Sequence, residues 1–520
     1  MTIADIRPPA DRLARHIADG HWTKPGAPTG VAHALRAHAK RNPNKTLVVD
    51  RLGKLTYAEV EELAARIAHN LRALGIGRLD AVLVQLPNWR EALIVQIALE
   101  SLEAVTIPVP AMYRAREVSF MARLTTAKAA FVPAGFGNFD FLDMLRTLRT
   151  ELPTLEHVFA VEADGVSRPR GEDVRTFDSL VSGSARLTHA ELEVASLDPD
   201  SVVEIGFTSG STGDPKGAVH TSNTLCAEHV VWSRAFGLGE SDVLFMPSTV
   251  GHQIGWTAMR TGALLGATVL FIDRWEVGAA IDLMTREGAT FTFTTPAFLY
   301  DVVQSPRLTK GTLAAMKTWV LAGQVVTSAL RDEAHAKLPH IRFSHLFGMT
   351  EMGCTIMSDK DVPPEKVLAT GRAQPSVEVA AREEGELVVK SASLFLGYYQ
   401  RDDLTEAAYT SDGFFRTGDQ VTIDADGYVQ VTGRIKDLIK RGGESVSPGE
   451  IEEILVKHPK IAEVSVVGVP DTRLGERVCV FVVPRPGETV TLEDVTAFVG
   501  AAKLAKQKWP ERIEIVDALP

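Results

Sequence analysis

The first strong pattern in the chain is a series of apolar residues at helical spacing after Thr56. These residues fall on one face of a helix with about 3.6 residues per turn, at Val60, Leu63, Ala64, Ile67, Leu71 and Leu74. Thr56 and Glu59 have the spacing of a capping box, which begins helices. Gly75 follows the last apolar position, as is typical of a helix end. The pattern predicts an amphipathic helix between Thr56 and Leu74.

Short apolar runs then alternate with helical segments over most of the chain. Residues 81–86 predict a strand, 89–102 a helix and 104–109 a second strand. The same rhythm returns later, with a helix at 277–287 and strands at 202–207, 243–246, 268–272, 291–294 and 318–321. Alternation of this kind predicts parallel sheets covered by helices. The expected fold class is α/β, with a large N-terminal domain of layered sheets.

The pattern changes in the last third of the chain. Residues 376–434 read as short alternating strands, with Asp426-Gly427 as a hairpin turn, and predict a β-rich subdomain. A basic, glycine-rich segment follows, and then a helix capped by Ser447 that begins at Pro448. We therefore divide the chain into an N-terminal domain, residues 1–435, and a small mobile α+β domain, residues 436–520.

Composition excludes several classes of partner. The chain has 520 residues, of which 45% are hydrophobic and 23% charged, as in a soluble globular protein. Its net charge of −11 argues against nucleic acid and anionic membrane surfaces as partners. No run of about 18 apolar residues predicts a membrane span.

The three cysteines, Cys226, Cys354 and Cys479, are widely spaced and form no Cys-x-x-Cys pair. They predict neither a disulfide framework nor a zinc site, and favour a reducing compartment. Residues 1–15 contain no apolar core of signal-peptide length. We expect a cytoplasmic enzyme that is a monomer or a homodimer.

The most informative segment is Phe207-Thr-Ser-Gly-Ser-Thr-Gly-Asp-Pro-Lys-Gly217, between a predicted strand and a helix near Thr221. Its glycines let backbone amides approach an anion, while its hydroxyls and lysine add donors and charge. The candidate phosphate-binding residues are Thr208, Ser209, Gly210, Ser211, Thr212, Gly213 and Lys216. A solvated Gly/Ser loop is the alternative. A Walker loop is excluded because glycine, rather than serine or threonine, follows Lys216.

With this loop the chain resembles the superfamily of adenylate-forming enzymes, which includes acyl-CoA synthetases, peptide-synthetase adenylation domains and beetle luciferases. The resemblance extends over nearly the whole chain. It rests on several motifs in the order typical of the family, namely Leu55-Thr-Tyr-Ala-Glu59, His345-Leu-Phe-Gly-Met-Thr-Glu351, Gly385-Glu-Leu387 with Gly397-Tyr398, Phe415-Arg-Thr-Gly-Asp419 and Gly433-Arg-Ile-Lys-Asp-Leu-Ile-Lys440.

The resemblance implies a ligase that activates a carboxylic acid with ATP as an acyl-adenylate and then transfers the acyl group to coenzyme A. It implies that Thr350 donates to the α-phosphate and that Glu351 holds Mg²⁺. Asp419 is expected to accept both ribose hydroxyls, with help from Arg434. The adenine site is expected to include Gly323, Gln324, Phe347, Gly348 and Met349. The implied catalytic set is Thr350, Glu351, His252 and Lys216.

The resemblance also implies movement of the small domain. Lys436 aligns with the hinge about which that domain rotates between adenylation and thiol transfer. After rotation, the loop with Lys440, Gly442, Gly443 and Glu444 is expected to line the pantetheine tunnel, since its glycines allow close passage of a thin chain. An ordinary glycine-rich linker is the alternative for this loop.

The acyl pocket is expected at His252, Trp256, Gly323, Met349 and Cys354. Apolar liners and glycine-rich walls suit an uncharged ring or a medium chain, and cyclohexanecarboxylate is the best single candidate. The sequence reveals no carboxylate in this pocket to pair with an amino group, which disfavours amino acid substrates. His229, His340 and His345 lack metal-ligand spacing.

The resemblance places a Gly-Lys pair shortly after a phrase like Glu514-Ile-Val-Asp-Ala-Leu-Pro520, whose lysine bridges the acid and the α-phosphate. The printed sequence stops before that pair. Lys503, Lys506 and Lys508 lie upstream and do not occupy the motif. Without the lysine we expect the free-energy barrier to adenylation to rise by several kcal/mol. Thiol transfer from a supplied acyl-adenylate should survive.

Other functions remain open from the sequence. The chain could load a carrier-protein thiol instead of free coenzyme A, because both thiols lie on a pantetheine arm. A luciferase-like oxidoreductase would need oxygen chemistry that no residue here favours. A non-catalytic adenylate-binding protein is the non-enzyme hypothesis.

Overall fold

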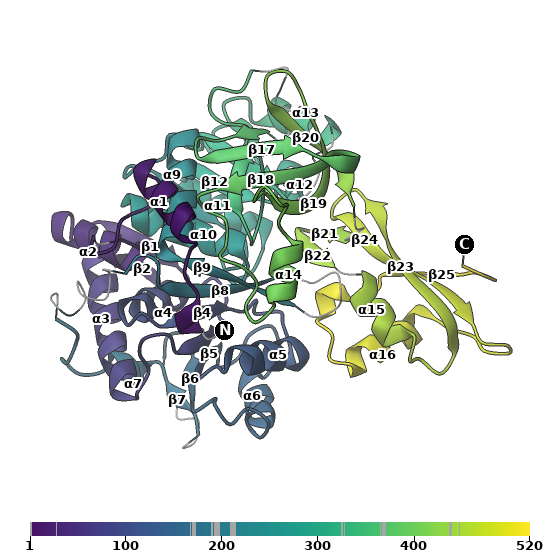
Figure 1. The fold of residues 1–520 in the computed structure, drawn as a ribbon, viewed down its shortest axis with the longest axis horizontal. Helices are drawn as coiled ribbons and strands as arrows, with labels where there is room; N and C mark the ends of the chain where they lie inside the picture. The colour runs from purple at the N-terminus through teal and green to yellow at the C-terminus, as the bar shows by residue number, and fades with distance from the viewer. Residues whose placement is uncertain are drawn as a thin grey trace.

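The structure is a computed structural model that describes residues 3–27, 29–166, 168, 173–188, 191, 198–208, 215–323, 326, 328–363, 366, 371–435, 439–446 and 448–519. Within these ranges the strands form three sheets. Two large sheets belong to the N-terminal part, and a small one lies at the right-hand end of the molecule in Figure 1, where the chain ends. The expected α/β class, with a large layered part and a small C-terminal part, is confirmed.

The largest sheet has 13 strands in the order β17-β18-β19-β20-β16-β15-β14-β13-β12-β10-β11-β1-β2. Neighbours from β1 through β11, β10, β12 and β13 to β14 are parallel, and those from β14 to β17 are antiparallel. The strands of the predicted β-rich subdomain therefore continue the α/β sheet. Their bounds are β1 (Thr46–Asp50), β2 (Gly53–Thr56), β10 (Val243–Met246), β11 (Thr268–Phe271), β12 (Phe291–Thr294), β13 (Thr318–Ala322), β14 (Arg342–Met349), β15 (Gly353–Met357), β16 (Gly371–Ala373), β17 (Val377–Ala381), β18 (Glu386–Ser391), β19 (Phe415–Ile423) and β20 (Tyr428–Arg434).

The second sheet has seven strands in the order β7-β6-β5-β3-β4-β8-β9, parallel except for the β8–β9 pair. Strand β9 was not predicted: the phosphate loop was expected to lead directly into a helix, and instead it turns back antiparallel to β8. Residues 217–221 are buried by this pairing. The strands are β3 (Ala81–Val84), β4 (Val105–Pro108), β5 (Ala129–Pro133), β6 (His157–Val161), β7 (Arg175–Thr176), β8 (Val202–Thr208) and β9 (Lys216–Thr221).

Helices fill the space between the two large sheets and cover their outer faces. The capping box at Thr56 is present, as predicted. Helices α2, α3, α4, α9 and α10 share one apolar core with strands of both sheets, while α5 and α6 cover the second sheet and α11, α12 and α13 the first. The bounds are α1 (Ala10–Ala18), α2 (Val31–Arg41), α3 (Tyr57–Ala73), α4 (Arg90–Ser101), α5 (Ala115–Thr125), α6 (Phe141–Arg149), α7 (Asp178–Val181), α9 (Ser222–Phe236), α10 (Gln253–Leu265), α11 (Val277–Glu287), α12 (Pro296–Gln304), α13 (Ser328–Lys337) and α14 (Asp402–Ala407).

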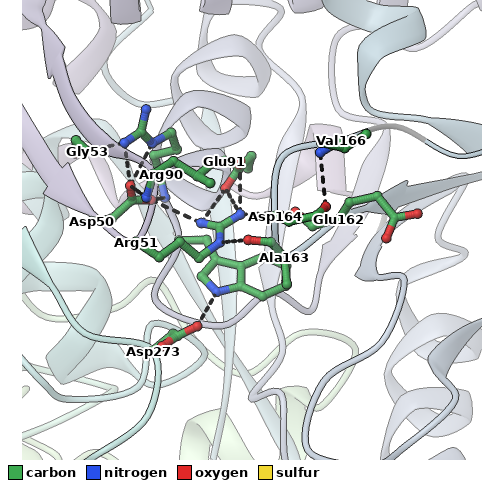
Figure 2. A network of polar contacts seen from close by, with 12 residues as sticks. Asp50, Arg51, Gly53, Arg90, Glu91, Glu162, Ala163, Asp164, Val166 and Asp273 are labelled. Carbon is green, nitrogen blue, oxygen red and sulfur yellow. Dashed lines mark hydrogen bonds and ion pairs between the residues drawn. The ribbon is translucent and has the colours of Figure 1, made fainter.

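A polar network joins the two large sheets at the β1–β2 hairpin (Figure 2). The Arg51 guanidinium contacts Glu91 of α4 through both terminal nitrogens, at 3.2 Å. Arg90 Nε donates to Asp50 Oδ1 at 2.8 Å. Trp89, whose ring lies 4.0 Å from the Arg51 guanidinium, donates its indole N–H to Asp273 at 2.9 Å. Charge, hydrogen bonding and ring stacking together hold α4 against the hairpin.

The small C-terminal sheet has five strands and an apolar core of its own. It has the order β22-β21-β24-β23, and β25 pairs with β24. Because residues 436–438 lie outside the described ranges, the boundary at 435/436 stays a prediction. The elements are β21 (Ile439–Arg441), β22 (Glu444–Val446), α15 (Pro448–Leu455), β23 (Ile461–Asp471), β24 (Gly475–Pro484), α16 (Leu492–Ala501) and β25 (Arg512–Ile515).

In the part of the chain that the structure describes, no helix has both the length and the apolar character needed to cross a bilayer.

Candidate active site

The predicted phosphate loop lies between β8 and β9, which pair antiparallel. Thr208 at the end of β8 pairs with Lys216 at the start of β9, so the two ends of the loop lie side by side. The five residues between them that were predicted to bind phosphate lie outside the described ranges: Ser209, Gly210, Ser211, Thr212 and Gly213. Their role stays a prediction, but the hairpin fixes the place at which they would act.

A segment from the β-rich part covers the free edge of β9. The backbone N–H groups of Leu396 and Tyr399 donate to the carbonyls of Val219 and Gly217, each at 2.8 Å. This pairing brings Tyr398 beside Lys216, whose Nζ lies 5.1 Å from the centre of the tyrosine ring. Tyr398 is buried.

Glu351 lies next to Tyr398. The tyrosine hydroxyl donates to Glu351 Oε1 at 2.8 Å, and the carboxylate is only 8% exposed. Lys216 and Glu351, predicted from widely separated motifs to act on phosphate and magnesium, thus contact the same side chain. The sequence analysis quoted Tyr398 within a motif but assigned it no role, because only the fold brings it to Glu351.

Thr350, the expected α-phosphate donor, is held by its backbone and its methyl group. Its carbonyl accepts a hydrogen bond from His220 Nε2 at 2.8 Å. Burial lowers the pKa of His220 to about 4, so the imidazole is neutral at pH 7. A Cβ on Gly206 of β8 would come within 2.9 Å of the Thr350 methyl carbon, so glycine permits this close approach. His220 is a supporting residue that sequence reasoning missed.

The predicted adenine residues Phe347, Gly348 and Met349 end strand β14. Glycine is required at 348, since a Cβ there would lie 2.4 Å from the Gly353 carbonyl oxygen across the β14–β15 hairpin. Phe347 and Met349 pack against the apolar core of the β-rich strands.

Asp419, the expected ribose acceptor, lies buried on β19. It pairs across the sheet with Arg434 on β20, the residue expected to assist it. The backbone therefore places these two residues opposite each other, and the side chain of Arg434 lies outside the description.

The loop of the small domain reaches Gly323, one of the residues predicted to form the adenine site. Gly323 follows the buried end of β13 with φ +81°, and a Cβ on it would lie 3.7 Å from the Gly443 Cα. A Cβ on Gly443, at φ +87°, would come 2.3 Å from the Thr295 Cγ2. Only glycine fits this contact, so the Gly442-Gly443 turn packs directly against Thr295 and Gly323. Gln324 and the proposed hinge Lys436 lie outside the described residues.

The neighbouring Glu444 meets His252 of the N-terminal part. Glu444 Oε1 and His252 Nε2 are 2.7 Å apart, and both side chains are largely buried. Burial lowers the pKa of His252, but the charge and hydrogen bond of Glu444 outweigh it and leave that pKa above 6.5. Burial likewise raises the pKa of Glu444, and His252 more than offsets it, so the carboxylate stays ionised. His252 and Glu444, predicted for the acid and the thiol tunnel, are thus brought together as an ion pair.

Two further contacts hold the small domain in this arrangement. The guanidinium of Arg473 contacts both oxygens of Asp301, at 3.0 and 3.1 Å. Lys508 is buried beside Glu450 of its own domain, at 3.0 Å, and lies 4.0 Å from Glu117 of α5. The predicted tunnel residue Lys440 lies on β21, and its own backbone N–H donates to the Glu476 carboxylate.

The predicted acyl-pocket residues divide between two apolar clusters. Trp256 and Cys354 share the core between the large sheets with Trp232, whose indole N–H donates to the Cys354 carbonyl at 3.0 Å. Met349 packs instead with Phe347 in the core of the β-rich strands. The structure therefore brings Trp256 and Cys354 together, but not Met349.

The structure adds a carboxylate that the sequence analysis did not find near this pocket. Glu228 on α9 is buried and accepts hydrogen bonds from the Cys354 backbone N–H at 2.8 Å and the Thr257 hydroxyl at 3.1 Å. Burial raises the pKa of Glu228 to about 7, against these hydrogen bonds, which lower it. No sequence pattern could reveal this, because Glu228 and Cys354 are 126 positions apart.

The residues present suit Mg²⁺ bound together with a nucleotide. Among the described residues no group of three or more histidine, cysteine, aspartate or glutamate side chains could hold a metal by itself. Mg²⁺ is commonly held by one or two carboxylates together with substrate phosphates. Glu351 fits this pattern: Tyr398 occupies Oε1, and no described residue donates a hydrogen bond to Oε2.

The chain matches two family profiles and resembles proteins of known function over most of its length. The profile of the family described as AMP-binding enzyme matches residues 35–399, and that of the AMP-binding enzyme C-terminal domain matches residues 450–520. The chain is 30% identical to the medium-chain fatty-acid–CoA ligase of Escherichia coli, over 98% of this chain and 90% of that protein. It is 32% identical to a 2-hydroxy-7-methoxy-5-methyl-1-naphthoate–CoA ligase of Streptomyces carzinostaticus, over 98% and 93%.

Among solved structures, the amide bond synthetase McbA of Marinactinospora thermotolerans superposes with a TM-score of 0.82. The match covers 94% of this chain and 96% of McbA, and the two sequences are 24% identical. At this identity the match shows that the two proteins share a fold. The family profile covers most of the chain, and relatives of 30% identity or more extend over nearly all of it. The protein therefore belongs to the AMP-binding family of adenylate-forming enzymes, as an acid–thiol ligase.

Proposed function

We propose that the protein is an ATP-dependent carboxylic acid–CoA ligase that forms an acyl-adenylate and then an acyl-CoA thioester, releasing pyrophosphate and AMP. The observation that carries the proposal is the contact of the glycine turn at 442–443 with Gly323, beside the His252–Glu444 pair. A loop proposed to guide a thiol thereby lies at the wall proposed for adenine. One site then serves both half-reactions.

In the first half-reaction, the acid attacks the α-phosphorus of ATP and pyrophosphate leaves. Lys216 supplies positive charge beside the hairpin loop, and Thr350 supplies a hydroxyl donor where charge develops on the α-phosphate. Asp419 accepts the ribose hydroxyls, for which a carboxylate with two acceptor oxygens is suited. Mg²⁺ held by Glu351 would neutralise charge on the phosphates.

In the second half-reaction, a thiol attacks the acyl carbon and AMP leaves. Support for this step comes from the contact of Glu444 with His252, which joins the proposed tunnel loop to the residue proposed to border the substrate carboxylate. We assign Lys436 as the hinge for rotation to and from this arrangement.

Free coenzyme A is the thiol we propose, with support from a cavity between the two domains. The cavity has a volume of about 560 Å³, and its lining includes Arg116, Glu117, Phe120 and Arg123 of α5, Pro215 before β9, and Glu450 of α15. Two arginines beside an aromatic ring suit a phosphorylated nucleotide. A carrier protein would present its pantetheine without that nucleotide.

The acid we propose is an uncharged ring or a medium chain, with cyclohexanecarboxylate as the first candidate. The large rings of Trp232, Trp256 and Phe293 are packed in the same apolar core as Cys354, beside the predicted acyl pocket. The relatives named above act on a medium-chain fatty acid and on a naphthoate. The three cysteines are free thiols, in agreement with a cytoplasmic location.

The test is thioester formation from a panel of ring and medium-chain acids. Each acid is supplied both as free acid with Mg-ATP and as preformed acyl-adenylate, with free coenzyme A or a pantetheinylated carrier protein as acceptor. Acyl-CoA from the adenylate supports the ligase and identifies the acid. Product formed only on the carrier protein would show that the acceptor is a carrier thiol rather than free coenzyme A. Nucleotide binding without product on either thiol would refute the ligase.

A further inference from the structure

Residues 394–399 connect three parts of the fold at one point. Through Leu396, Gly397 and Tyr399 this segment pairs with β9, the strand that begins with Lys216. Through Phe395 it reaches the β14–β15 turn, since the Phe395 N–H donates to the Glu351 carbonyl at 2.7 Å. The segment therefore joins the second sheet, the first sheet and the β-rich strands beside the proposed metal ligand.

The Tyr398 side chain adds a contact to the Glu351 carboxylate itself. Its hydroxyl lies 2.8 Å from Oε1, and the centre of its ring lies 5.1 Å from the Lys216 Nζ. Glu351 is thus held at both its main-chain and side-chain oxygens by one short segment. A carboxylate restrained at one oxygen keeps a single rotamer and presents the other oxygen in a constant direction.

Residues near the N-terminus also hold the segment and the residues just before it. The Arg12 guanidinium of α1 donates to the Phe395 carbonyl at 2.9 Å and also contacts the Leu394 carbonyl. The Trp22 indole N–H donates to the Ala392 carbonyl at 2.8 Å and is buried. Both residues precede position 35, where the match to the family profile begins.

We propose that Tyr398 is a positioning residue for the metal-dependent half-reaction, orienting Glu351 toward magnesium, with Arg12 bracing the segment that carries it. The inference rests on the proposed role of Glu351 as the magnesium ligand. Tyr398 does not itself touch the metal or the nucleotide. Loss of its hydroxyl frees the carboxylate to rotate while leaving the ring in the core.

The experiment measures Mn²⁺ binding to the ATP complex of the full chain by electron paramagnetic resonance, so that the readout does not depend on turnover. Tyr398→Phe should weaken Mn²⁺ affinity about tenfold, the lower range for loss of a hydrogen bond to a metal ligand. Tyr399→Phe is the matched control, since it removes a hydroxyl from the next residue, whose side chain packs in another core. Its affinity should equal that of the wild type.

A second pair of variants separates positioning from general damage. In a Glu351→Ala background, Tyr398→Phe should cause no further loss, because the two residues act through one contact. Arg12→Ala should weaken Mn²⁺ affinity about two- to threefold, and Arg12→Lys should recover part of it. Thioester formation from preformed acyl-adenylate should be unchanged in Tyr398→Phe, since that step needs no metal contact from Glu351.

Two results would overturn the inference: equal Mn²⁺ affinity in Tyr398→Phe and wild type, or an equal loss in Tyr398→Phe and Tyr399→Phe. If wild type binds Mn²⁺ no better than Glu351→Ala, Glu351 is not the metal ligand and the inference falls with it. Acyl-CoA formation from adenylate in the same preparation then shows whether the proposed ligase function survives that failure.

Discussion

Charged side chains join the two large sheets to each other and also join the small domain to the N-terminal part, but each charge has more partners between the sheets. At the first, Arg51 meets Asp50, Glu91 and the Trp89 ring at once, and Arg90 adds a second cation at Asp50 (Figure 2). Side chains there are 14% exposed or less. Several partners for each charge make an interface that is costly to open.

The small domain is attached at three separate places, and at one of them Lys508 is buried between Glu450 and Glu117. Arg473 with Asp301 and His252 with Glu444 are each a single pair, and the Arg473 side chain is 50% exposed. The exposed Arg473–Asp301 pair can break and re-form without leaving a buried charge on the arginine. The difference indicates that the sheets form one rigid body, whereas the small domain is attached in a way that permits the proposed rotation.

Breaking the dense network should have the largest effect on stability. We expect Arg51→Met to lower the free energy of unfolding by about 3 kcal/mol, because Glu91 would stay buried without its cation. Urea unfolding followed by fluorescence measures this change. Arg473→Met, the control from the sparse interface, should cost less than about 1 kcal/mol. Equal losses in the two variants would contradict the comparison.

Glu228 contrasts with the carboxylates of the dense network because, among the described residues, it is buried without a cation. Its hydrogen-bond partners, Cys354, Thr257 and Gln253, are all uncharged. Its pKa is raised from 4.5 to about 7, so the folded state binds a proton more tightly than the unfolded state. This contribution to the free energy of unfolding is about 3 kcal/mol. It is fully present below pH 4.5 and is lost as pH rises to about 7.

Glu228→Gln should remove this pH dependence, because an amide does not titrate in this range. The measurement is the free energy of unfolding of wild type and variant at several values between pH 4.5 and 8. The wild type should lose stability relative to the variant as pH rises. A constant difference between the two proteins would show that Glu228 titrates normally.

The fold was largely predictable from sequence where burial follows a local pattern. Helix α11 and strand β12 have the bounds expected from their apolar spacing, Val277–Glu287 and Phe291–Thr294. Strand β9 was missed because its burial comes from pairing on both sides, with β8 and with residues 396–399. Neither neighbour can be read from residues 216–221 alone.

The candidate site was predictable as a set of motifs, but not as a set of contacts. Lys216, Glu351 and Asp419 were named from their motifs, and the fold brings Lys216 and Glu351 to one tyrosine. The pairing of His252 with Glu444 depends on how the small domain docks, which no local pattern encodes. Met349 was assigned to the acyl pocket, and in the structure it packs against the core of the β-rich strands, whereas Leu346 lies in the core between the large sheets.

The His252–Glu444 pair should affect one half-reaction only. We expect Glu444→Gln to slow thioester formation from preformed acyl-adenylate about tenfold, equivalent to about 1.4 kcal/mol of docking. Mn²⁺–ATP binding should stay at the wild-type value. Both are measured on the full chain, and a loss in nucleotide binding would show that Glu444 supports the whole site rather than the docked arrangement.

The pH dependence of this effect follows from the raised pKa of His252, which Glu444 holds above 6.5 in the docked form. Docking is therefore strongest when His252 is protonated and weakens as pH rises through that pKa. The ratio of wild-type to Glu444→Gln rates should fall toward one at high pH, and taking the ratio cancels ionisation of the thiol. The nearby charge of Lys508 lowers the pKa of His252, so removing that charge should move this fall to higher pH.

The smallest effect is expected at the Arg473–Asp301 pair. Its two contacts, at 3.0 and 3.1 Å, have good geometry, but the exposed arginine is screened by solvent. Asp301→Asn should slow thioester formation from preformed adenylate less than about threefold, with the difference from wild type shrinking further in high salt. An effect as large as that of Glu444→Gln, or one insensitive to salt, would mean that this contact is a fixed part of the rigid body. The small domain would then be attached as densely as the two sheets are to each other.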